Sequence, residues 1–98
     1  MYNQQILDLA RGEIEQQIQS MPAQFTSFDF YTAFAANHSR KYQQLIRIYT
    51  QRHDRPHAIQ ILHSQLMHTV NDRFSHLVRK THTIANPKGG DMSAWVKA

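Results

Sequence analysis

The feature that most constrains the fold is the C-terminal stretch of the chain, residues 74–97. Its centre, Asn86-Pro-Lys-Gly-Gly-Asp91, combines a proline, which fixes φ, with two glycines, which permit positive φ. The residues on either side include many β-branched and aromatic side chains, which are typical of strands. We therefore predict a tight turn between two strands, one within 74–84 and the other within 92–97.

Alternation along these two strands indicates which side chains face the protein interior. In the first strand, Val78 and Ile84 fall on one face. In the second, Trp95 or Val96 is expected to enter the core. We therefore expect the hairpin to pack one apolar face against the rest of the chain.

A long helix is predicted before the hairpin, from residue 56 to residue 72. Pro56 stands in its first turn, where the missing N–H of proline costs nothing. Four apolar side chains fall within about one third of the helix circumference at 100° per residue and are expected to face inward: Ile59, Leu62, Leu66 and Val70. The opposite arc is mostly polar and holds Gln60, Ile61, Ser64, Gln65, His68 and Asn71.

Three further helices are predicted upstream. The first spans 2–20, where apolar residues recur at helical spacing before the stop signal of Pro22. Residues 22–27 are interpreted as a connector whose last residue, Ser27, caps the second helix. The third helix, 40–51, follows a weak break at 37–39 and has an apolar face of Tyr42, Leu45, Ile46 and Tyr49. The second helix contains Phe28, Phe30, Tyr31 and Phe34, a cluster expected to lie in the core rather than to stack on bases.

Length and composition bound the remaining possibilities. The chain has 98 residues, of which 41% are hydrophobic and 18% charged, so we expect one globular domain, 1–98. It contains no cysteine, which excludes disulfides and thiolate metal sites. No apolar run approaches the roughly 18 residues of a membrane span, and no signal peptide is recognisable. We therefore expect a cytoplasmic protein with no membrane partner.

The net charge of +4 is distributed unevenly along the chain. Residues 1–37 have one cation and four acids, whereas residues 38–98 have ten cations and three acids. Positive charge concentrated in one part of a domain attracts polyanions. The plainer alternative is that these basic residues only solvate a surface.

In the predicted order, three helices come before helix 56–72, which is followed by a strand, a turn and a second strand. This order of elements resembles winged helix-turn-helix domains. The resemblance implies an α+β, mainly helical fold that ends in a two-stranded β-hairpin, the wing. It implies binding of nucleic acid, in particular double-stranded DNA, by a small regulatory or accessory protein, with helix 56–72 in the major groove and the hairpin 74–97 on the backbone or in the minor groove. In that arrangement Gln and Asn side chains would pair with adenine and basic side chains would hold phosphates. The residues implied are Arg55, Gln60, Ser64, Gln65, His68, Asn71, Arg73, Arg79, Lys80 and Lys88.

Two other binding functions remain open. In a protein-interaction module, the same helix and hairpin would bind an acidic partner protein. A homodimer would form through helix 2–20. A histidine metal site is the third alternative, although no pair of the seven histidines has the close spacing of a zinc site. The pairs considered are His53 with His57, His63 with His68, and His76 with His82. The acids are scattered and no nucleophile–base pattern is present, so we expect neither catalysis nor a cofactor.

Overall fold

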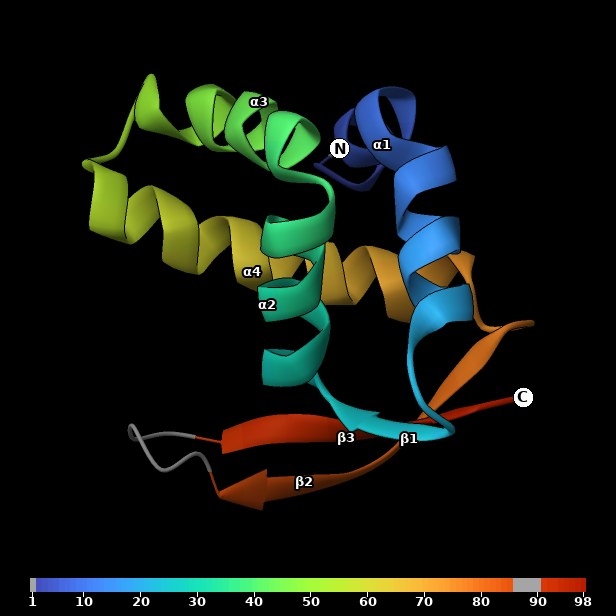
Figure 1. Ribbon diagram of the computed structural model, residues 1–98. Helices are drawn as coiled ribbons and strands as arrows, with labels where there is room; N and C mark the ends of the chain where they lie inside the picture. The colour runs from blue at the N-terminus through green and yellow to red at the C-terminus, as the bar shows by residue number, and fades with distance from the viewer. Residues whose placement is uncertain (1, 86–90) are drawn as a thin grey trace.

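The computed structural model describes residues 2–85 and 91–98, and within them it contains helices followed by a C-terminal hairpin (Figure 1). The fold class predicted from the sequence, α+β and mainly helical, is confirmed. The elements in chain order are α1 (Tyr2–Ser20), β1 (Gln24–Thr26), α2 (Ser27–Asn37), α3 (Ser39–Thr50), α4 (Arg55–Arg73), β2 (Val78–Ala85) and β3 (Asp91–Lys97). The predicted turn lies largely outside the described residues, and Lys88 lies outside them.

The sheet has three strands rather than the two that the sequence predicts. Strand β1 comes from the segment 22–27, which was interpreted as a connector, and it pairs antiparallel with β3 so that the order is β1-β3-β2. Phe25 lies opposite Trp95 in this pairing, and both side chains are buried. Three residues are too few to show the alternation of apolar and polar side chains that is typical of a strand. Strand β1 is therefore recognised from its pairing with β3 and not from its own sequence.

The hairpin begins later than predicted because the end of α4 occupies its first residues. The N–H of Phe74 donates to the carbonyl oxygen of Val70 at 3.1 Å, and the Phe74 ring is buried. Residues 75–77 form a turn, and the strand starts only at Val78. The hairpin, predicted over 74–97, therefore begins at Val78 and not at residue 74.

A β-bulge in β2 changes which side chains share a face. Val78 pairs with Lys97 before the irregularity at 80–82, and Ile84 pairs with Met92 after it. Directly opposed residues share a face and successive residues alternate, so the extra residue places Val78 and Ile84 on opposite faces. The predicted common face of these two residues is wrong, whereas the burial of Trp95 is confirmed.

The starts of α2 and α4 are fixed by side chains that bind free backbone N–H groups. Thr26, not Ser27, caps α2: its hydroxyl accepts from the N–H of Asp29, and the Asp29 carboxylate accepts from the N–H of Thr26, both at 3.0 Å. Asp54 caps α4 by accepting from the N–H of His57 at 2.9 Å. Helix α4 is thus one residue longer at each end than the predicted 56–72.

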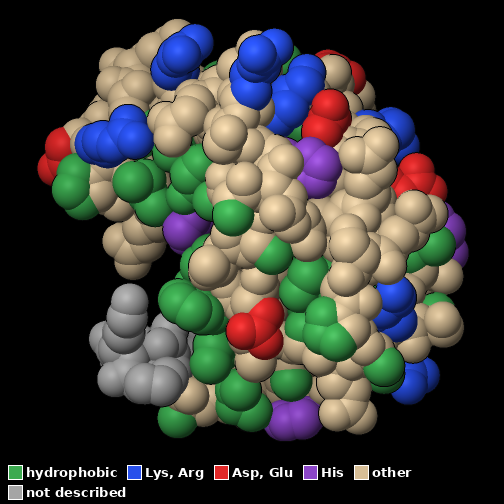
Figure 2. All heavy atoms as spheres, viewed as in Figure 1, with side chains coloured by type: hydrophobic (Ala, Val, Ile, Leu, Met, Phe, Trp, Pro, Cys, Tyr) green, Lys and Arg blue, Asp and Glu red, His purple; other side chains and the backbone are tan. Residues whose placement is uncertain are grey.

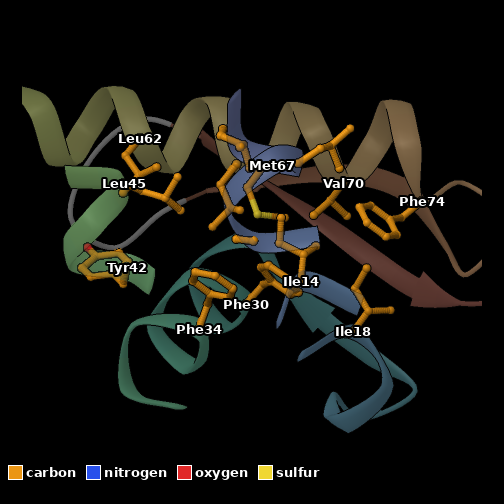
Figure 3. Close-up of a cluster of buried hydrophobic side chains, with 14 of the residues drawn as sticks. Ile14, Ile18, Phe30, Phe34, Tyr42, Leu45, Leu62, Met67, Val70 and Phe74 are labelled. Carbon is orange, nitrogen blue, oxygen red and sulfur yellow. The ribbon is translucent and has the colours of Figure 1, made fainter. Parts of the chain in front are cut away.

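The core lies where α4 crosses α1 and α2, and it receives side chains from every helix and strand (Figure 3). The inward positions predicted for α4 are confirmed for Leu62, Leu66 and Val70, which are fully buried, while Ile59 is only partly buried at the rim. Five apolar residues of α1, Ile6, Leu7, Ala10, Ile14 and Ile18, are buried within the same chain, so a homodimer through α1 would have to use mainly its polar side. Among the described residues, none of the helices combines the length and hydropathy required to cross a membrane.

Candidate nucleic-acid interface

A groove of about 290 Å³ lies between α4 and the sheet, with the start of α2 at one end. It is lined by four of the residues implied by the sequence resemblance, Ser64, His68, Asn71 and Lys80. Met67 and Trp95 contribute apolar surface to the same groove. In the space-filling view the surface is hollowed below α4, where a histidine side chain is visible (Figure 2). The helix and the hairpin therefore present polar side chains to one shared recess.

The polar residues of α4 form one exposed stripe along the helix. Ser64 and His68 are four residues apart and Asn71 follows three residues later, so their side chains share a face. Gln60, four residues before Ser64, extends the stripe beyond the groove toward the start of α4. All four residues are exposed, and all four have side chains able to donate or accept hydrogen bonds.

Arg79 and Lys80 were implied together as phosphate contacts, but the strand directs them to opposite sides. Lys80 pairs with Trp95 and lies on the face that packs against the helices, where it lines the groove. Arg79 pairs with Val96 and lies on the other face of the sheet. Only Lys80 is therefore next to the α4 stripe.

Three further implied residues, Arg55, Gln65 and Arg73, do not line the groove. The Arg55 guanidinium at the start of α4 donates to the side-chain oxygen of Gln43 on α3 at 3.3 Å, on the side of α4 away from the hairpin. Gln65 is partly buried, and Arg73 is exposed in the last turn of α4.

A stack of aromatic rings forms one end of the groove, and sequence reasoning did not identify it. The rings of Tyr31 and His63 are parallel within 11°, with their centroids 3.8 Å apart. The Tyr42 hydroxyl lies 2.7 Å from Nε2 of His63, and Phe28 packs edge-on against Tyr31. These side chains come from three different helices, so no local pattern links them. The stacking covers one face of each of these two rings, and both Tyr31 and His63 line the groove.

Burial changes the protonation of this stack. It lowers the pKa of His63 from the ordinary 6.5 to about 4, so the imidazole is neutral at pH 7. Burial also raises the pKa of Tyr31 and of Tyr42, and the positive charge of Arg55 partly opposes the rise at Tyr42. A neutral imidazole can accept the hydrogen bond of the Tyr42 hydroxyl, which fixes the distance between α3 and α4.

The sheet side of the groove is held in place by a second buried hydrogen bond. The indole N–H of Trp95 donates to the hydroxyl oxygen of Ser27 at 2.8 Å, and both residues are buried. This bond joins β3 to the first residue of α2. It provides an acceptor for the indole N–H, which is the only polar group of the tryptophan side chain. The large apolar ring is therefore buried without leaving a hydrogen-bond donor unpaired.

The histidines do not assemble into a metal centre in the part of the chain that the structure describes. His53 and His57 come closer than the sequence indicates, with ring centroids 4.8 Å apart. However, no group of three or more potential metal-ligating His, Asp or Glu side chains occurs among residues 2–85 and 91–98. A protein zinc site uses at least three protein ligands.

Comparisons of this chain with protein-family models, with curated proteins and with solved structures find no match.

Proposed function

We propose that this chain binds double-stranded DNA through the exposed face of α4 and the adjacent hairpin. The observation on which the proposal depends is the polar stripe Gln60, Ser64, His68 and Asn71, which runs along one exposed face of a 19-residue helix beside Lys80. The major groove admits a single α-helix, and amide side chains on such a helix can pair with adenine. Lys80, at the edge of the stripe, would contact a phosphate and set the position of the helix.

We infer further that the fold is a variant of the winged helix, in which α4 is the helix before the wing and β2–β3 form the wing. The order of α4, β2 and β3 supports this inference. Helix α3 is additional to the simplest three-helix plan. It packs against α4 and leaves the α4 stripe uncovered.

The test is a selection of random duplexes by the parent and by two variants, Gln60→Ala and Ser64→Ala. Each change should alter the preferred sequence by about 1–3 kcal/mol of discrimination at one base pair and should change non-specific affinity much less. Gln5→Ala is the matched control because Gln5 is an exposed glutamine on α1, away from the stripe. A parent that enriches no sequence, or variants that enrich the parent's sequence equally well, would count against base contact by this face.

A protein-interaction function is the second candidate because one apolar residue interrupts the polar arc of α4. Ile61 is only partly buried on this arc, between Gln60 and Leu62. An acidic partner protein would place an apolar side chain against it. Binding of such a partner would weaken only modestly as salt rises, whereas phosphate contacts give a steep dependence.

A further inference from the structure

Helix α3 and the turn after it form a basic surface that is separate from the groove. Residues 39–55 contain five cations and one acid, a net charge equal to that of the whole chain: the cations are Arg40, Lys41, Arg47, Arg52 and Arg55, and the acid is Asp54. Figure 2 shows Lys and Arg side chains gathered along the top of the view, over α3 and the α3–α4 turn. The groove between α4 and the sheet is lined by other residues.

Two of these arginines form a line on the outer side of α3, which we call the arginine line. Arg40 and Arg47 are seven residues apart, which is two helical turns or about 10 Å along the axis. Both side chains are exposed, while the opposite side of α3 is buried through Tyr42, Leu45 and Ile46. The two guanidinium groups therefore point to solvent from the same side of one helix.

Two acids adjoin this surface and do not cancel its charge. The Asp54 carboxylate accepts from the N–H of His57 and caps α4. Glu13 of α1 lines a recess together with Arg40 and Lys41, so one carboxylate there faces two cations. The surface keeps an excess of positive charge, which attracts a polyanion.

The groove and the arginine line are separated by the thickness of two helices. In Figure 1, α4 lies between α3 and the sheet. The axes of packed helices are about 8–10 Å apart, and the major groove is only about 8.5 Å deep. A duplex that receives the α4 stripe therefore ends beside α4 and does not reach the outer side of α3. A short duplex also cannot bend around the chain, which extends 35 Å along its longest axis, because the persistence length of DNA is about 150 bp.

We propose that the arginine line binds the phosphate backbone of a second DNA duplex, so that one chain bridges two duplexes. The inference rests on the proposed function, in which the first duplex lies against α4 and Lys80. Guanidinium groups form paired hydrogen bonds with phosphate oxygens. Phosphates of one strand follow one another about every 3.4 Å along the duplex axis, so a line about 10 Å long spans about three of these steps. Phosphate contacts carry no sequence information, so the second duplex can have any sequence.

The first test counts the duplexes bound per chain by sedimentation. A random duplex of about two helical turns, roughly 21 bp, is supplied in excess at about 10 mM salt. The parent should bind two duplexes per chain. Arg40→Gln/Arg47→Gln should bind one, because the loss of two phosphate contacts should weaken the second binding step by more than about a hundredfold. Arg11→Gln is the matched control and should bind two, since it removes an exposed arginine from α1, outside the proposed surface.

The second test measures bridging directly. A duplex fixed to beads should capture a second, labelled duplex only when the parent chain is present. Capture should fall again when the chain is in large excess, because each duplex is then covered by its own chains. Arg40→Gln/Arg47→Gln should lose the capture and Arg11→Gln should keep it. Circular dichroism checks that every variant is folded.

Three outcomes would overturn the proposal, and they differ from one another. If the parent binds one duplex per chain, the arginine line holds no second duplex, and the proposed function survives. If Arg40→Gln/Arg47→Gln still binds two duplexes per chain, the second duplex is held by another surface. If the parent binds no duplex at about 10 mM salt, where charges are least screened, the proposed function fails together with this inference.

Discussion

At the scale of single residues, His63 shows what local sequence cannot predict. The sequence indicates only that several histidines lie in a basic half of the chain. In the structure the His63 ring is stacked on Tyr31 and hydrogen-bonded to Tyr42, and these partners precede it by 32 and 21 residues in the numbering. The polar residues Ser64, His68 and Asn71 were predictable because their relation depends only on helical periodicity.

The lowered pKa of His63 predicts a loss of stability in acid. The unfolded chain takes up the His63 proton near pH 6.5, and the folded chain only near pH 4. Between these values the unfolded state binds more protons, so the contribution of this residue to the free energy of unfolding decreases as pH falls from about 6.5 to about 4. In His63→Gln this contribution is absent. The difference in thermal midpoint between parent and variant should therefore shrink from pH 7 to pH 5, and parallel pH profiles would contradict the assignment.

At the scale of elements, the helices were predictable and the sheet was only partly so. The phase of α4 follows from its own apolar spacing, which correctly placed Leu62 and Leu66 in the core. Strand β1 and the bulge near Thr81 both depend on pairing with β3, and β3 is about 70 residues away from β1 in the sequence. The residues next to β1 or Thr81 in the sequence therefore do not predict either feature. The bulge is also what places Val78 and Ile84 on opposite faces of the sheet.

Truncating Leu66 tests the phase of α4 directly. Leu66 is fully buried, so Leu66→Ala should lower the free energy of unfolding by about 2–5 kcal/mol through lost burial and the cavity left behind. Ile59→Ala, at a partly buried position of the same helix, should cost distinctly less. Denaturant unfolding of the two variants provides the measurement. If the two variants lose equal free energy of unfolding, Leu66 does not lie on the inward face of α4 as assigned.

At the scale of the whole molecule, the exposed cations of the second half of the chain lie on several sides: Arg40 and Arg47 on α3, Lys80 beside the groove, and Arg79 on the other face of the sheet. The sequence showed that the basic residues are concentrated after residue 37, and the resemblance implied that hairpin side chains hold phosphates. It did not reveal that Arg79 lies on the face of the sheet away from the helices, or that Arg40 and Arg47 lie on the exposed side of α3, outside the groove. Both facts follow from how α3, α4 and the sheet pack together, which is a property of the tertiary structure.

The most direct test of DNA binding is the affinity of the parent chain for a random duplex, measured by fluorescence anisotropy across about 50 to 200 mM salt. The proposed function places Lys80, which lines the groove beside the stripe, against a phosphate. With about 0.9 unit of slope per phosphate contact, log K should fall linearly with log salt with a slope of about −0.9 or steeper. The absence of a complex at the lowest salt, or an affinity that hardly changes with salt, would contradict the account.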